Sequence, residues 1–315
     1  MINKINHHPV RRCSELLFLG ASYSSISQFS LSPVYGSIPA SIHHKNLIIT
    51  TILLAYAAKI LYRAKFVESR VRWVQYIPIA ATAVPPMQSL LFKQSSWLGP
   101  LWGPSVTEIC TFAPILFLIV LATGLELDNI GINRFGKRVG AIVSVSLMFV
   151  IIEFLRGMTT EWMINAMGYN LIFTRAGLQH AIAVLYALKF PSRKSYPATL
   201  LWALSLGTNS HLLWQARTAA LNETLLNHGY ALVARNESLT GYISVLDNVN
   251  DAFRVMRCDH SLLGGEWINT PRTHASGLKE PIYAVFTMLE AVRLVVPPDS
   301  GSHFVSDTEK EALVV

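Results

Sequence analysis

Long apolar segments, separated by short loops rich in lysine and arginine, dominate the first two thirds of the chain. Of its 315 residues, 51% are hydrophobic and only 14% are charged, a composition more apolar than that of ordinary soluble domains. A membrane-spanning helix needs about 20 consecutive, mostly apolar residues. Four segments meet this requirement most clearly, namely residues 46–62, 73–92, 106–124 and 139–155.

Three further segments are apolar but carry more polar residues. Residues 14–35 are rich in serine, residues 169–188 include Arg175 and His180, and residues 197–214 form the third. The aliphatic residues around Arg175 offset the cost of inserting one cation near the end of a segment. The sequence therefore predicts six or seven spans and a multi-pass integral membrane protein, with the lipid bilayer as its partner and the organelle left open. A signal peptide is the alternative interpretation of residues 14–35, because Arg11 and Arg12 precede them.

The distribution of charge bears on orientation and on partners. The formal net charge is +7, with +11 in residues 1–214 and −4 in residues 215–315. Basic loops at 63–72, 134–138 and 189–194 are expected on the cytoplasmic side. Glycosylation sequons at Asn222 and Asn236 favour a luminal C-terminal segment, but the loss of one weak span would reverse it, so its side stays open. The basic residues lie in short clusters between apolar runs, so no nucleic-acid partner is expected.

Ionisable side chains inside the predicted spans have two interpretations. Glu153 and Arg156 lie one helical turn apart, and Arg175 and His180 share another segment. Within a membrane such groups mark functional sites, whereas near span ends they commonly extend to the interface. Their positions favour the second interpretation.

No metal site or redox motif is expected. The three cysteines lie too far apart for a zinc or thiol-exchange motif, and their odd number favours free thiols. They are Cys13, Cys110 and Cys258.

The pattern changes after residue 214. Residues 215–239 form an amphipathic connector, and the runs TGYISVLDN (240–248) and AFRVMRCD (252–259) predict a hairpin across an Asn/Asp-rich turn. Residues 260–268 are expected to add a third strand, in which Gly264 and Gly265 allow a bend or bulge.

A helix and a further strand are predicted beyond this meander. Residues 280–295 have Pro281 at the expected first helical position and a Pro-Pro stop after them. The final residues, ALVV (312–315), read as the start of a buried parallel strand.

In order and spacing, ARNESLTGYISVLDN, FRVMRCDHSLLGGEW and EPIYAVFTMLEAVRLV followed by ALVV resemble the N-terminal part of spermidine and spermine synthases, the polyamine aminopropyltransferases. The likeness is strongest to fungal members with a multi-span membrane region in front, and it covers about residues 235–315. In that family ALVV is the first strand of a Rossmann-like domain, and a glycine-rich loop for the adenosyl cofactor follows it. The resemblance therefore implies a chain truncated before its cofactor loop and its catalytic acids.

The same resemblance implies two substrate-binding residues and no catalytic or metal-binding ones. Tyr283 matches the tyrosine that lines the amine pocket, and Asp259 matches the aspartate of a family turn. Three positions depart from the family pattern, which puts the amine substrate in doubt: Ala284, Thr240-Gly241 and Leu263. Tyr283 also fits a core-facing helix position, and Asp259 also fits a plain turn residue.

These features predict a mainly α fold. A polytopic transmembrane helical bundle (1–214) leads through a connector (215–239) into an incomplete, spermidine-synthase-like α+β domain (240–315). The predicted function is that of a membrane relative of the aminopropyltransferases, or of similar adenosylmethionine-dependent transferases, inactive in this chain and without a cofactor. A full-length relative would use decarboxylated S-adenosylmethionine or S-adenosylmethionine, with a polyamine as partner. The alternative is a non-enzymatic membrane protein, transporter-like or scaffolding, with a remnant C-terminal domain.

Overall fold

The chain divides into a helical part and a sheet part. The computed structural model describes residues 9–61, 73–130, 136–191, 193, 196–209, 211, 215–238, 240–259, 261–268 and 280–281. One compact unit comprises Met1–Leu221 with Asn236–Tyr242, and the other comprises Asn222–Arg235 with Ile243–Val315. We refer to them as the helical unit and the sheet unit.

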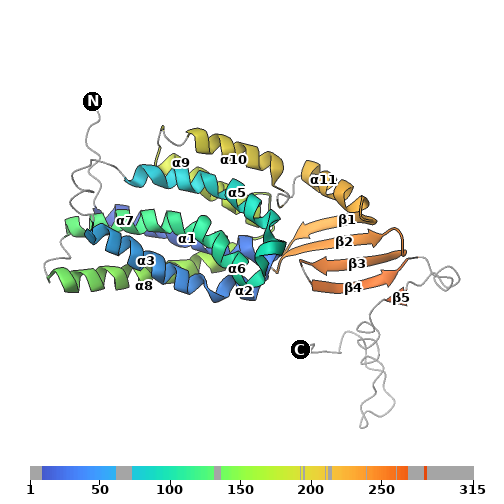
Figure 1. Cartoon of the computed structure of the whole chain (residues 1–315), viewed down its shortest axis with the longest axis horizontal. Helices are drawn as coiled ribbons and strands as arrows, with labels where there is room; N and C mark the ends of the chain where they lie inside the picture. The colour runs from blue at the N-terminus through green and yellow to red at the C-terminus, as the bar shows by residue number, and fades with distance from the viewer. Residues whose placement is uncertain are drawn as a thin grey trace, which may run out of the picture. The chain divides into compact units, whose positions relative to one another are not determined.

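The helical unit is built around α1 and α7, which lie side by side (Figure 1). Leu16 of α1 and Phe112 and Ile119 of α7 have no exposed surface, and burying such a side chain stabilises a fold by about 1.5–3 kcal/mol. The helices are α1 (Pro9–Tyr35), α2 (Ser37–Ile42), α3 (His44–Leu61), η1 (Trp73–Tyr76), α5 (Ile77–Lys93), α6 (Ser95–Cys110), α7 (Phe112–Ile130), α8 (Lys137–Ala166), α9 (Arg175–Lys189) and α10 (Tyr196–Thr208); α11 (Gln215–Leu226) follows them.

Proline and glycine interrupt two of these helices. Pro85 and Pro86 lie inside α5, where each removes a backbone donor from the helical ladder. Gly99 has a φ of 66° and bends α6, a conformation that glycine adopts without the steric cost of a Cβ atom. Four residues later, Gly103 lies directly against the ring of Tyr35, so that no Cβ would fit there. The chain thus brings α6 against the C-terminal end of α1.

The predicted polytopic membrane bundle is wrong. Across the described ranges, one helix, Arg138–Ala166, is long and apolar enough to cross a membrane, with a mean hydropathy of 2.1, and counting the bent pair Ser95–Cys110 and Phe112–Asp128 as one span gives two at most. The expected multi-pass membrane location is wrong as well. Most predicted spans do coincide with helices, but α3, α5, α6, α9 and α10 have only 18, 17, 16, 15 and 13 residues. Part of their apolar surface meets in a shared core, which includes Ile52 of α3, Val84 of α5 and Ile182 of α9.

The sheet is an antiparallel meander in which each strand pairs with the next, in the order β1-β2-β3-β4-β5. The strands are β1 (Tyr230–Glu237), β2 (Tyr242–Asn248), β3 (Phe253–Cys258), β4 (Ser261–Trp267) and β5 (Glu280–Pro281). The predicted hairpin across the Asn/Asp turn is present, with Asn248 opposite Phe253. The third strand is present too, and the register shifts between Met256, which lies opposite Gly264, and Arg257, which lies opposite Leu262.

The end of the described chain differs from the prediction. Pro281 was expected at the first position of a helix, but it belongs to β5, opposite Glu266. The rest of that predicted helix and the predicted strand 312–315 lie outside the described residues.

No disulfide joins Cys13, Cys110 or Cys258 in the described part of the chain. Cys13 on α1 is buried, and this burial raises the pKa of its thiol to about 11, so the thiol stays protonated near neutral pH. It therefore behaves as a small core residue.

Candidate functional site

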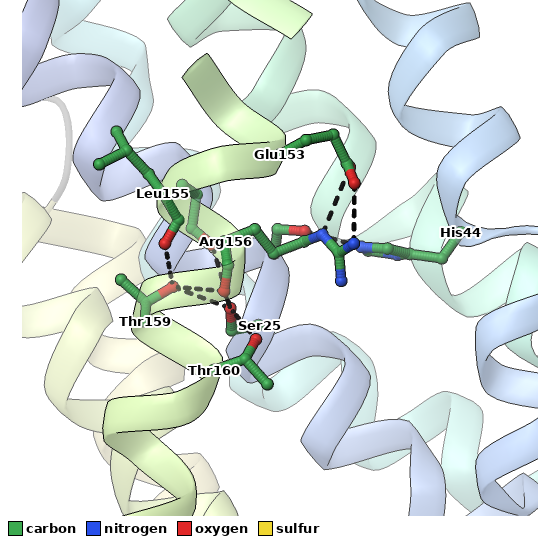
Figure 2. A network of polar contacts seen from close by, with 9 residues as sticks. Ser25, His44, Glu153, Leu155, Arg156, Thr159 and Thr160 are labelled. Carbon is green, nitrogen blue, oxygen red and sulfur yellow. Dashed lines mark hydrogen bonds and ion pairs between the residues drawn. The ribbon is translucent and has the colours of Figure 1, made fainter. Parts of the chain in front are cut away.

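Hydroxyl groups on α1 connect this helix to its neighbours. Buried hydroxyls need hydrogen-bond partners, so each contact fixes how α1 is rotated in the core. Figure 2 shows one of them, in which Ser25 meets Thr159 and Thr160 of α8 at 3.0 and 2.8 Å. The others join Ser24 to His44, Ser27 to Glu108, and Ser30 to Gln179.

The most deeply buried ionisable side chains of this network are those of His44 and Glu108. His44 Nδ1 lies 2.6 Å from Glu108 Oε1, and its Nε2 lies 2.7 Å from Ser24 Oγ. Ser27 Oγ donates to the same carboxylate oxygen at 3.2 Å, and Phe112 stacks on the imidazole with 5.3 Å between ring centroids. The two side chains join α3 directly to α6, and Ser24 and Ser27 join both helices to α1.

Ser24, His44 and Glu108 contact one another in that order, as do a nucleophile, its general base and the acid that orients the base in a catalytic triad. However, Ser24 has no exposed surface and His44 is only 3% exposed. Neither residue lines the cavity described below. The arrangement therefore stabilises the core and offers no access to a substrate.

Glu153 and Arg156 form an ion pair with each other on α8. Figure 2 shows the Arg156 guanidinium directed toward the Glu153 carboxylate, with 2.8 Å between Nη2 and Oε2. The two side chains are 29% and 22% exposed, and such partly exposed pairs contribute little to stability. The pair is a surface feature of this helix.

Arg175 begins α9 and is held by Glu237. Its backbone N–H donates to Glu237 Oε1 at 2.6 Å, and its Nη1 donates to the same oxygen at 3.0 Å and to the Ser238 carbonyl at 2.9 Å. Thr174 caps the helix by accepting from Gly177 N, and an anion at a helix N-terminus is favoured by the helix dipole. Both charged side chains are at most 2% exposed. The segment 236–242 is thereby fixed to the helical unit.

A small polar cavity lies beside this pair. Its volume of ≈ 20 Å³ is enough for about one water molecule. Gln88 is 5% exposed, and its Nε2 has no hydrogen-bond partner among the described residues. The lining consists of Ser30, Pro85, Gln88, Phe92, Arg175, Ala176, Gln179, Asn209, His211 and Tyr242. Hydrogen-bond donors are prominent in it, so the cavity suits an acceptor group.

His180, one turn after Arg175, does not join this site. Its imidazole is 6% exposed, contacts Trp202 edge to face at 5.6 Å, and has no hydrogen-bond partner in the described part of the chain. Burial lowers its pKa from 6.5 to about 4, because the charged form loses its hydration.

Acid should therefore destabilise the protein through His180. Between pH 6.5 and 4, His180 binds a proton in the unfolded chain but not in the folded chain. Its contribution to the free energy of unfolding is therefore fully present above pH 6.5 and is lost as the pH falls. The full effect is about 3 kcal/mol. Urea unfolding across this range should show a smaller pH dependence for His180→Leu than for the unsubstituted protein. Parallel curves for His180→Leu and the unsubstituted protein would contradict the prediction.

Of the two residues implied by the family resemblance, the structure describes one. Asp259 lies in the turn after β3 with a φ of 50° and is half-buried, as its turn interpretation expects. Tyr283 lies outside the described residues. No group of three or more His, Cys, Asp or Glu side chains that could hold a metal occurs in the residues that the structure describes.

Sequence reasoning missed the cavity. Arg175 stands out as an ionisable residue within an apolar segment, but Gln88 lies inside a predicted span and Glu237 lies inside a glycosylation sequon, and neither setting predicts a cavity. The useful indication was a lone amide or cation inside an otherwise apolar helix.

Comparison with known proteins corrects the family. The chain is 41% identical over 284 residues to a protein of Emericella nidulans named N-terminal histidine N-methyltransferase, and the alignment covers 89% of this chain and 50% of that protein. The chain thus spans about half the length of this curated relative. No family model and no solved structure matches the chain.

The aminopropyltransferase interpretation is therefore wrong, and the polyamine pathway and decarboxylated S-adenosylmethionine are no longer expected. The resemblance rested on a strand meander followed by a short helix, a pattern that many unrelated proteins share. The coarser expectation, a relation to a group-transferring enzyme, is confirmed by a relative that is a methyltransferase.

Proposed function

We propose that this chain is part of a methyltransferase that acts on a nitrogen of an N-terminal histidine. The observation that supports the proposal is the 41% identity over 284 residues to a protein of that name. The S-adenosylmethionine alternative of the sequence analysis agrees with it, since this cofactor is the usual methyl donor.

The described residues do not fit the usual site for such a donor. Adenosyl cofactors typically bind at a glycine-rich turn between a parallel strand and a helix. The described sheet is an antiparallel meander whose neighbouring strands are consecutive in the chain.

We assign the acceptor polypeptide to the helical unit. A histidine that accepts a methyl group must present one nitrogen lone pair to the methyl donor and lose one proton in exchange. This geometry requires the acceptor to be held in a fixed orientation. The donor-lined cavity beside the buried Arg175–Glu237 pair supports the assignment, because a rigid site keeps its hydrogen-bond donors in place.

Binding and methylation of short peptides test this function. The full chain should bind a peptide with a free N-terminal histidine at least about tenfold more tightly than the same peptide beginning with alanine, a difference of about 1.4 kcal/mol. Calorimetry measures the affinities. Mass spectrometry after incubation with S-adenosylmethionine shows whether a methyl group is added. Equal affinity for the two peptides, with no methylation, would overturn the proposal.

A further inference from the structure

We propose that the cavity lined by Ser30, Gln88, Arg175 and Gln179 binds the carbonyl oxygen of the first residue of the acceptor polypeptide, with Gln88 Nε2 as its hydrogen-bond donor. The inference rests on the proposed function in one respect: it takes the acceptor to be a polypeptide with a free N-terminal histidine.

The donor of Gln88 is the first argument. Pro85 and Gln88 come from α5, Ser30 from α1, and Arg175 and Gln179 from α9, so three helices of one unit converge on the cavity. Gln88 is 95% buried, and its amide nitrogen has no partner within the described ranges. Folded proteins seldom leave a buried donor unpaired. A buried donor without a described partner, on a residue that lines a cavity, is suited to a ligand acceptor.

Two neighbouring side chains of the lining have hydrogen-bond partners. Gln179, 3% exposed, has both ends of its amide engaged, because Oε1 accepts from Ser30 Oγ at 2.5 Å and Nε2 donates to Tyr23 Oη at 3.4 Å. The Arg175 guanidinium donates to Glu237 and to the Ser238 carbonyl. The charge of the cavity wall is therefore balanced, which favours an uncharged acceptor over an anion.

The size of the cavity is the second argument. The cavity volume of ≈ 20 Å³ accommodates about one oxygen-sized group. An imidazole ring is too large for this volume. A carbonyl oxygen fits this space and accepts up to two hydrogen bonds. Phe92 and His211 in the lining are only partly buried, so the cavity is reached from the surface.

The chemistry of the transfer is the third argument. The nitrogen that takes up the methyl group must present a free lone pair, and a donor such as Gln88 Nε2 would occupy that lone pair. The cavity therefore suits the carbonyl next to the reacting groups and leaves both histidine nitrogens outside it. Because the carbonyl carbon is bonded to the same Cα as the side chain and the amine, this contact orients the whole residue.

Two ligands that differ in one group test the inference. Histamine has the imidazole and the amine of histidine but no carbonyl, whereas the amide of His-Ala-Ala has all three. The unsubstituted protein should bind the peptide about tenfold more tightly than histamine, as expected for one hydrogen bond to a buried donor. Gln88→Leu and Gln88→Met should weaken peptide binding about tenfold and leave histamine binding unchanged. Calorimetry gives all these affinities.

A matched variant controls for the loss of a glutamine. Gln28 on α1 donates to the Ala40 carbonyl at 2.9 Å and does not line the cavity, so Gln28→Leu should keep the affinity for the peptide. Unchanged peptide affinity in both Gln88 variants overturns the inference, while selectivity for N-terminal histidine in the same proteins leaves the proposed function standing. Equal affinity of the unsubstituted protein for the peptide and for histamine also overturns the inference. This test does not depend on the folding of any variant. Absence of any selectivity for N-terminal histidine overturns the proposed function instead.

Discussion

Replacing Glu237 by alanine should destabilise the helical unit by about 3–5 kcal/mol. The carboxylate accepts from both the backbone N–H and the guanidinium of Arg175, at 2.6 and 3.0 Å. Both side chains are at most 2% exposed, so the variant leaves a cation with little solvent and without its main counter-charge. The midpoint of urea unfolding, followed by circular dichroism, measures the loss.

Two further variants separate this effect from a general cost of removing a carboxylate. Glu153→Ala removes the acid of the partly exposed pair on α8 and should cost about 1 kcal/mol or less. The double variant Arg175→Met with Glu237→Leu should recover much of the lost stability, because neither charge then remains buried. If Glu237→Ala costs no more than Glu153→Ala, the buried pair is not the stabilising contact that we infer.

Replacing Glu108 by alanine should cost about 2–5 kcal/mol, because it leaves two buried groups, His44 Nδ1 and Ser27 Oγ, without this partner. The carboxylate is the partner of His44 Nδ1 at 2.6 Å and accepts from Ser27 at 3.2 Å. With side chains 3% and 2% exposed, His44 and Glu108 have almost no access to water that could replace the lost contact. Glu108→Gln keeps the shape and one acceptor oxygen, so it should cost less, about 1–2 kcal/mol.

The same cluster allows a test of its structural role. Ser24→Ala removes a hydroxyl 2.7 Å from His44 Nε2 and should cost about 1 kcal/mol. Because Ser24 is fully buried, its loss should leave peptide binding unchanged. A Ser24→Ala protein that is stable but has lost its activity would show that the triad-like geometry is catalytic after all.

Local features of the fold were predictable from the sequence, and their surroundings were not. The apolar segment 46–62 coincides with α3, and the Asn/Asp turn correctly predicted the β2–β3 hairpin, because both depend on residues close together in the chain. Hydropathy counts apolar residues without showing what they contact, so helices that pack on one another read as membrane spans. The serines of α1 read as a weakness of a span, although they join helices in the core.

The candidate site could not be predicted from the sequence for a similar reason. Arg175 and Glu237 are 62 positions apart, and no local pattern pairs a residue in an apolar helix with one in a polar strand. Gln88 became informative only when the structure showed its amide nitrogen buried and without a described partner. The family was misassigned because a meander and a proline-initiated segment carry little specific information.

The two kinds of contact in this chain also differ in when they can form during synthesis. Each strand of the meander pairs with the strand next to it in sequence, and such local pairing forms quickly. Ser30 of α1 meets Gln179 only after 149 further positions have been added. The Ser30 contact of α1 can therefore form only later in synthesis than the contacts of Ser24 with α3 and of Ser27 with α6.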